Sequence, residues 1–507
     1  MATVTTINGL LGKLTSSPGE RVATLEELRT ALGLLHPRDL DDVVPNLSLQ
    51  ILFQCMQEKN RDEAELSKEI LKRLFAASDP CSVITQYKDE IYSGIKSESV
   101  QMKELCLLQV YRCASTEKGR QELLQSSLDI LYLCVQCLAD KEISVGKEAG
   151  RVLKCLGESQ AGLEFLFQGN LLDKMKSLMK IDDVIRYRVY EVAVDIFLTS
   201  PQAIVYGSNS GIITQLISEL ERDDILIQMN CIEMLSTIAS CQHGLQYLDQ
   251  QGIVGKVESI MVAAESDPLV GFLMPGLIKF FGSIARYEPS EVFEKHPLFV
   301  RTVFTLLTSS DLTQKGVAID TVGIVGSTVA GKLVLHKQGK NMIDCMRVMG
   351  SLVQQPPTEM RIRTLESIAA LLHVKKAEQT EDILSLTERW FLEISSKPMD
   401  TMFGLCNQPF GEIRGGAFLV LQSIGNQPWG QRQMNDYPGF TEYILDRSTE
   451  SEKLGKELKF DIVKVLVESP TTADIFGRPY LLRLKEYLRE GPFYVKVQSE
   501  VAMEGDG

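Results

Sequence analysis

The chain has 507 residues, of which 44% are hydrophobic and 24% are charged, so it can build a core and is not wholly disordered. Its 67 Asp and Glu outnumber its 53 Lys and Arg, and the net charge of -14 argues against nucleic acid as a partner, because phosphate backbones are repelled. Aromatic residues make up only 7%, which favours helices packed through aliphatic side chains over a β-sandwich.

The sequence carries no recognisable targeting signal. Residues 1–14 lack the basic segment and apolar run of a signal peptide, and no stretch reaches the roughly 18 apolar residues that cross a membrane. The 11 Cys are an odd number scattered through apolar stretches, as is typical of reduced intracellular cysteine. We therefore expect a cytoplasmic protein, with the nucleus as a second compartment, and no membrane partner.

The chain is predicted to begin with a flexible N-terminus over residues 1–20. Beyond it, apolar residues recur at spacings of +4, +3 and +4, which put four side chains on one face of a helix. Five such sets are clear, and most follow an acidic turn. They are Val145, Ala149, Val152 and Leu156; Ile185, Val189, Val192 and Ile196; Ile227, Cys231, Met234 and Ile238; Leu273, Leu277, Phe280 and Ile284; and Ile413, Ala417, Val420 and Ile424.

These sets repeat with a period near 42 residues. Four weaker sets are centred on Leu107, Ile319, Leu365 and Phe460, and the second core positions of all nine are 40–52 residues apart. A period of this length with two or three helices is typical of HEAT and armadillo repeats. The sequence therefore predicts an all-α fold, with residues 21–490 forming a single α-solenoid of about ten such repeats. Residues 491–507 are predicted to form a C-terminal tail, acidic and disordered at its end.

Glycine and proline mark the junctions of the predicted helices. We interpret the glycines as residues whose left-handed backbone ends one helix and lets the next begin at an angle. Pro275 is predicted to kink a long helix from within, and Pro356 and Pro357 precede the longest spacing. The glycines fall into two groups: Gly162, Gly244, Gly331 and Gly430 open segments of the form Gly-x-x-x-apolar, and Gly169, Gly211, Gly252 and Gly439 precede new apolar helices.

Two motifs resemble catalytic or metal-binding signatures but fail in detail. Residues 326–333 (GSTVAGKL) match a phosphate-binding loop until Leu333, where that loop needs Ser or Thr, and their context is helical. Cys134 and Cys137 have metal or redox spacing, yet no second ligand pair lies nearby. We read the first motif as a helix junction and the cysteines as core residues. The sequence thus predicts no enzyme, no cofactor and no metal.

Basic residues near the starts of the predicted long helices are the candidate partner-binding positions. In a protein with a net charge of -14, cations that recur at one helical position suggest a ladder for an acidic partner. The alternative for any single residue is ordinary solvated charge. The candidate set is Arg186, Tyr187, Arg188, Lys279, Arg286, Arg361, Arg363 and Arg414.

Several segments go beyond a generic solenoid. They are residues 170–180 (NLLDKMKSLMK), 184–191 (VIRYRVYE), 278–282 (IKFFG), 316–326 (GVAIDTVGIVG), 426–429 (NQPW), 438–443 (PGFTEY) and 490–496 (EGPFYVK). Together they resemble the proteasome non-ATPase regulatory subunit 5 family, whose members are assembly chaperones of HEAT/armadillo type. The resemblance extends from about residue 20 to the C-terminus.

The resemblance implies a non-catalytic chaperone for assembly of the base of the proteasome regulatory particle. Family members hold an ATPase subunit through its C-terminal domain, together with a large non-ATPase scaffold subunit, and leave before the mature particle forms. The implied protein is a monomer when free and has no cofactor. The alternative is a generic armadillo-type adaptor for transport or scaffolding. An import-type adaptor needs a repeated Trp/Asn ladder, whereas only Trp390 and Trp429 are present.

Overall fold

A computed structural model describes residues 2–35, 40, 44, 47–57, 60–355 and 357–494, and within these ranges every regular element is a helix. The predicted all-α fold is therefore confirmed. Pro356 and residues 495–507 of the predicted tail lie outside the described residues. None of the helices in these ranges is long and apolar enough to span a membrane.

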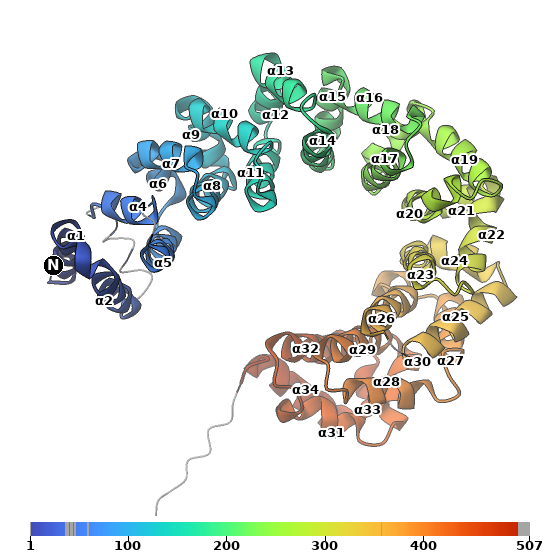
Figure 1. The fold of residues 1–507 in the computed structure, drawn as a ribbon. Coiled ribbons are helices and arrows are strands. Elements are labelled where there is room, and N and C mark those ends of the chain that lie inside the picture. The colour runs from blue at the N-terminus through green and yellow to red at the C-terminus, as the bar shows by residue number, and fades with distance from the viewer. Residues whose placement is uncertain are drawn as a thin grey trace, which may run out of the picture. The chain divides into compact units, whose positions relative to one another are not determined.

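The chain divides into two compact units, whose helices are labelled in Figure 1. Unit 1 comprises Met1–Met234 and His243–Gln251, and unit 2 comprises Leu235–Gln242 and Gly252–Gly507. Two helices lie at the division, namely α17 (Ile225–Ile238) and α18 (Gln242–Gln250). The continuity of the predicted array from residue 21 to residue 490 stays a prediction.

Unit 1 consists of short helices followed at intervals by long ones. Its other elements are α1 (Ala2–Ser16), η1 (Pro18–Glu20), α2 (Arg21–Gly33), α4 (Gln50–Gln57), α5 (Arg61–Ala77), α6 (Pro80–Gln86), α7 (Lys88–Lys96), α8 (Val100–Ala114), α9 (Glu117–Ser126), α10 (Leu128–Cys137), α11 (Ile143–Leu156), α12 (Gln160–Phe167), α13 (Gly169–Leu178), α14 (Asp183–Phe197), α15 (Pro201–Ser210), α16 (Ile212–Ser218) and η3 (Glu219–Glu221).

Unit 2 repeats the same arrangement. Its elements are α19 (Ile253–Ala264), η4 (Val270–Leu273), α20 (Met274–Ala285), α21 (Pro289–Lys295), α22 (Pro297–Leu306), α23 (Leu312–Val325), α24 (Val329–His336), α25 (Lys340–Leu352), α26 (Thr358–Leu372), η5 (Lys376–Glu378), α27 (Glu381–Leu392), α28 (Pro398–Cys406), α29 (Gly411–Gly425), α30 (Pro428–Asp436), α31 (Phe440–Leu445), η6 (Arg447–Thr449), α32 (Lys453–Glu468), α33 (Thr472–Phe476) and α34 (Arg478–Glu490).

The long helices carry the core. In unit 1, α8, α11 and α14 pack side by side, and in unit 2 the series α20, α23, α26, α29 and α32 does the same. Every residue of the five clear apolar sets is buried, so the predicted 42-residue period is the period of these long helices. Two of the acidic turns before them cap a helix: Asp182 accepts a hydrogen bond from the Ile185 amide at 2.7 Å, and Asp224 accepts one from the Leu226 amide at 2.9 Å.

The N-terminus differs from the prediction of a flexible segment over residues 1–20. Helix α1 occupies most of it, and Ile7, Leu11 and Leu14 are buried where it packs against α2. Two glycines within the helix, Gly9 and Gly12, weaken its local helical signal. Burial of one apolar face outweighs that weakness.

Two further details correct the sequence-based expectations. Pro275 does not kink a helix from within, because it stands at the first turn of α20, where the missing N–H of proline leaves no hydrogen bond unmade. In α32 the core position belongs to Lys459, which is buried, while Phe460 is only half-buried. The core position that the sequence predicts at Phe460 therefore lies one residue earlier. The apolar pattern misplaces it because a lysine does not count as a core residue.

The two groups of glycines serve different purposes. Gly211, like the other three members of its group, has a positive φ (79°), which confirms the left-handed role. Gly331 has no such backbone; a Cβ there would lie 1.7 Å from the Val325 carbonyl oxygen that ends the preceding long helix. Gly162 and Gly430 show the same close approach, so this group permits tight helix junctions.

Candidate protein-binding groove

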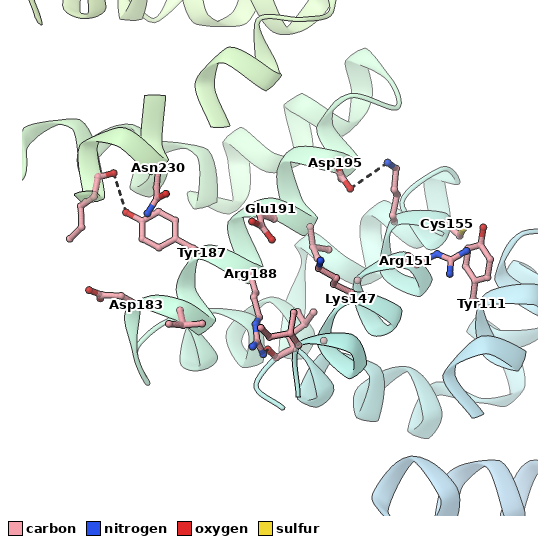
Figure 2. A pocket seen from close by; sticks show the side chains of 18 of the residues that line it. Tyr111, Lys147, Arg151, Cys155, Asp183, Tyr187, Arg188, Glu191, Asp195 and Asn230 are labelled. Carbon is pink, nitrogen blue, oxygen red and sulfur yellow. Dashed lines mark hydrogen bonds and ion pairs between the residues drawn. The ribbon is translucent and has the colours of Figure 1, made fainter. Parts of the chain in front are cut away.

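Unit 1 contains a groove of about 970 Å³ over the exposed faces of successive long helices (Figure 2). Tyr111 of α8 closes one end, and α11 and α14 form the body. The other end consists of Asp224 and of Leu226, Ile227 and Asn230 of α17. All of its lining residues belong to unit 1. A groove of this kind, built from one helix per repeat, is the surface on which repeat proteins bind partners.

The floor of the groove depends on two glycines of α11. A Cβ at Gly150 would lie 2.9 Å from Val192 Cγ2 of α14, and one at Gly146 would lie 3.2 Å from Arg188 Nη1. Glycine at these positions therefore brings α14 close to α11. The groove is hollow here because neither glycine projects a side chain.

Three exposed apolar side chains form one edge of the groove, which we call the apolar rim. Ile143, Val184 and Leu226 stand in the first turns of α11, α14 and α17 and are 62%, 62% and 71% exposed. They are 41 and 42 residues apart, so each repeat contributes one. Sequence reasoning missed them, although each is an additional apolar residue just before a predicted core set.

Most of the charges lining the groove are separated by sign. The exceptions are Arg188 on α14, which is bound to backbone carbonyls, and Glu158 just after α11, which pairs with Arg120 at 3.1 Å. Helix α11 provides a basic wall, which comprises Lys147, Arg151 and Lys154. Helix α14 and the residue before α17 provide an acidic wall, which comprises Asp183, Glu191, Asp195 and Asp224. The Arg151 guanidinium lies 4.0 Å from the Tyr111 ring centroid, and Lys154 reaches across to Asp195 at 3.4 Å. Figure 2 shows Lys147 and Glu191 on neighbouring helices of the same surface.

The structure brings two of the predicted residues, Tyr187 and Arg188, into the groove wall. The Tyr187 hydroxyl donates a hydrogen bond to the Ile227 carbonyl at 3.3 Å, which ties α14 to α17. Burial, with the carboxylate of Glu219 second, raises the pKa of Tyr187 to about 12. Arg188 donates to the Leu138 and Asp140 carbonyls at 3.1 and 2.6 Å and so caps the end of α10.

Arg186 lies beside the groove and is engaged within the chain. Its Nη2 is 2.6 Å from Asp183, and its Nε is 3.1 Å from Glu219, whose side chain is 5% exposed. Tyr190 also donates to Glu219 at 3.2 Å. The guanidinium therefore holds α14 against η3.

The predicted residues of unit 2 do not line one surface together, although Arg286 and Arg363 share a hollow of about 460 Å³ with Asp320. Arg361 donates to the Val353 carbonyl at 2.8 Å, and Arg363 pairs with Asp320. Arg414 is 9% exposed and pairs with Glu450. Lys279 and Arg286, both on α20, are exposed. Each of these arginines engages a neighbouring segment, earlier in the chain for Arg188 and Arg363 and later in the chain for Arg186 and Arg414. The ladder for an acidic partner stays a prediction.

The two motifs that resemble a phosphate-binding loop and a metal or redox site, residues 326–333 and the pair Cys134 and Cys137, lie in helical segments. Lys332 of residues 326–333 is fully buried and donates to the Gly326 and Ala370 carbonyls, with Ala370 at 3.2 Å. Thr328 caps α24 by accepting from the Gly331 amide at 3.0 Å, so the motif is a helix junction. Cys134 and Cys137 are buried in α10, where burial raises the pKa of both thiols. Among the described residues, no group of three or more His, Cys, Asp or Glu is arranged to hold a metal ion.

Comparison with known proteins places the chain in a family. The family described as "Proteasome non-ATPase 26S subunit" matches residues 4–507. Proteins named 26S proteasome non-ATPase regulatory subunit 5 from Homo sapiens and Mus musculus are 40% and 39% identical over 95% of this chain and 96% of their own. The Drosophila melanogaster protein of that name is 26% identical over 99% of this chain and 95% of its own.

Among solved structures, an engineered protein aligns with 87% of this chain and 99% of its own at 15% identity and a TM-score of 0.36, too low to bear on the fold. The sequence matches, in contrast, extend over nearly the whole chain, and the family match begins at residue 4, within α1. The chain therefore belongs to the family of 26S proteasome non-ATPase regulatory subunit 5.

Proposed function

We propose that this protein is a non-catalytic chaperone for assembly of the base of the proteasome regulatory particle. The observation that carries the proposal is family membership over nearly the full length of the chain, because the relatives are named as non-ATPase regulatory subunits of the 26S proteasome. The groove of unit 1 supports it by offering an exposed surface with both apolar and charged groups.

In the proposed mechanism, the groove holds the C-terminal domain of an ATPase subunit within a module that also contains a second ATPase subunit and a large non-ATPase scaffold subunit. The bound chaperone covers a surface of the ATPase subunit and so blocks early docking on the proteolytic core or pairing with a wrong neighbour. It leaves before the mature particle forms. Reversible release fits a partly polar interface better than a wholly apolar one, because obligate interfaces are the more hydrophobic class.

The experiment is recovery of the tagged full-length protein from cells, followed by identification of bound proteins, with the tag alone as control. The expected partners are ATPase subunits and the large scaffold subunit, without the proteolytic core. Recovery of no ATPase subunit would overturn the proposal. Stable recovery of the complete particle would contradict release before maturation. Recovery of unrelated proteins in place of proteasome subunits would favour the adaptor alternative.

A further inference from the structure

The apolar rim has a spacing that selects among partner elements. Packed helices lie about 8–10 Å apart, so one side chain per long helix gives apolar contacts at about that interval. A partner α-helix that crosses α11, α14 and α17 presents residues i, i+7 and i+14 on one face at intervals of about 10.5 Å. A β-strand covers about 10 Å in three residues and points the third side chain to the opposite face. A helix therefore fits the rim and a strand does not.

The charges of the groove give the partner a polarity. The basic wall lies on α11, and the acidic wall lies on α14 and at the start of α17, so charge changes sign along the direction in which a crossing helix would run. Lys147 and Glu191 are exposed members of the two walls. A partner with acidic side chains over α11 and basic ones over α14 and α17 complements both walls, and complementary charge mainly sets orientation and speeds encounter.

We propose that the groove of unit 1 takes an amphipathic helix that crosses α11, α14 and α17, with its apolar face on the apolar rim, its acidic end over the basic wall and its basic end over the acidic wall. This inference rests on the proposed function, because the helix belongs to the C-terminal domain of the ATPase partner. Helix-in-groove recognition uses anchors of this kind at regular helical spacing.

The first test measures the affinity of the full-length protein for the purified C-terminal domain of each proteasome ATPase subunit by calorimetry. Val184→Ser and Leu226→Ser should each weaken binding about fivefold to tenfold, because each removes apolar surface that the partner covers. Val205→Ser is the matched control, since Val205 is 56% exposed on α15 of the same unit and lies outside the groove. These three side chains are exposed, so the variants should keep the circular dichroism of the parent protein.

The second test concerns charge. Lys147→Glu should weaken binding about fivefold at low salt, and the difference should shrink as salt screens the basic wall. Lys118→Glu, an exposed lysine of α9 outside the groove, is the control and should leave the affinity unchanged. Equal affinities for the parent protein and all of the groove variants would overturn the inference while leaving the proposed function intact.

The third test determines whether the partner segment in the groove is helical. A photo-cross-linking amino acid in place of Ile143, Val184 or Leu226 should react with residues of one partner helix that are about seven and fourteen positions apart. Cross-links to positions three residues apart would show an extended segment and overturn the inference, as would cross-links to separate elements. If the parent protein binds no ATPase C-terminal domain, it is the proposed function that fails.

Discussion

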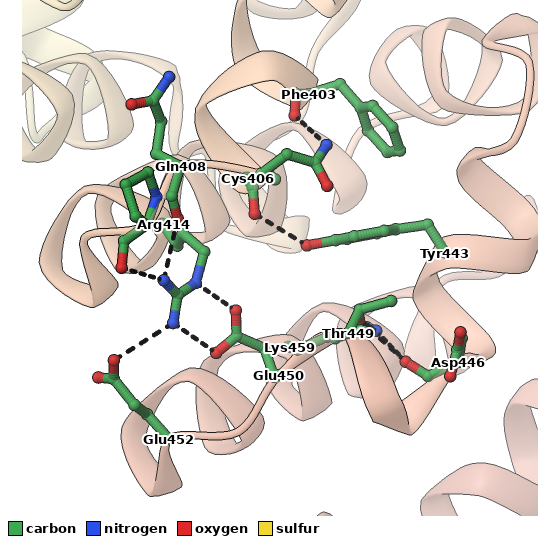
Figure 3. Close-up of polar contacts among 12 residues, drawn as sticks. Phe403, Cys406, Gln408, Arg414, Tyr443, Asp446, Thr449, Glu450, Glu452 and Lys459 are labelled. Carbon is green, nitrogen blue, oxygen red and sulfur yellow. Dashed lines mark hydrogen bonds and ion pairs between the residues drawn. The ribbon is translucent and has the colours of Figure 1, made fainter.

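Arg414 and Glu450 form a buried ion pair that fixes the connection between α29 and the segment before α32 (Figure 3). Arg414 Nε and Nη2 lie 2.5 and 3.2 Å from the two oxygens of Glu450, and Nη1 donates to the Gln408 and Pro409 carbonyls, each at 3.0 Å. The guanidinium of Arg414 therefore holds the segment before α32 against the start of α29. Removing one partner of such a pair leaves the other charge buried and uncompensated.

Glu450→Gln should therefore lower the free energy of unfolding by about 3 kcal/mol, measured by urea denaturation. Glu452→Gln is the matched control, because that side chain is 58% exposed and lies 3.4 Å from the same guanidinium. An exposed partner contributes less than about 1 kcal/mol, so the control should unfold almost like the parent protein. Equal effects of the two substitutions would contradict a special role for the buried pair.

Lys332 predicts a pH dependence of stability. Burial lowers the pKa of Lys332 to about 8 from 10.5, whereas in the unfolded chain lysine keeps a value near 10.4. Between about pH 8 and 10.5 the unfolded state therefore holds more protons on this residue, so its contribution to stability rises with pH and is lost as pH falls toward 8.

The measurement compares Lys332→Met with the parent protein by urea unfolding from pH 7 to 10. The stability difference should change in favour of the parent protein by at most about 1.4 kcal/mol per pH unit above pH 8 and stay nearly constant below it. Lys337→Met, which replaces an exposed lysine one residue after the same helix, is the control. If the difference in free energy of unfolding between Lys332→Met and the parent protein is independent of pH, burial does not lower the pKa of Lys332.

At the residue scale, sequence located the recurring arginines but not their partners. The position of Arg188 at the start of a long helix is visible in the sequence, whereas its acceptors, the Leu138 and Asp140 carbonyls, lie about 50 residues earlier. Backbone carbonyls at a helix end leave no trace in residue types. The burial of Lys459 could not be predicted for the same reason. Its Nζ donates hydrogen bonds to the Asp446 carbonyl and the Thr449 hydroxyl, both at 2.5 Å, and these acceptors allow a lysine at a core position.

At the scale of elements, helix junctions explain the glycines of the Gly-x-x-x-apolar segments. Gly331→Ala should destabilise unit 2 by about 2 kcal/mol or more, because its Cβ would overlap the Val325 carbonyl oxygen, which is backbone and cannot rotate away. Gly404→Ala in α28 is the control, since nothing lies within 4 Å of a Cβ there, and alanine should be neutral or slightly stabilising. Thermal unfolding of the two variants checks this, and similar melting temperatures would contradict it.

The long helices could be predicted because each must bury one continuous apolar face, which leaves a period in the sequence. The groove could not be predicted, because its shape depends on how neighbouring helices pack against each other and not on the pattern within one helix. Its depth depends on how closely α14 approaches Gly146 and Gly150, and its exposed rim depends on which first-turn residues the neighbouring repeat leaves uncovered. Ile143 and Val145 are both apolar and two residues apart, yet the first is 62% exposed and the second is buried.

For the whole molecule, the packing of repeats predicts that instability stays local. Helix α23 packs against α20, α22, α24 and α26, all within unit 2, and arrays of this kind gain stability from each repeat and its nearest neighbours. Gly331→Ala should therefore speed amide hydrogen exchange in α23, α24 and α26 and leave α8, α11 and α14 of unit 1 protected as before. Exchange measured by mass spectrometry on the full-length protein distinguishes this from one cooperative fold, in which both units would lose protection together. The local result would also mean that a substitution in unit 2 leaves the affinity of the unit 1 groove for its partner unchanged.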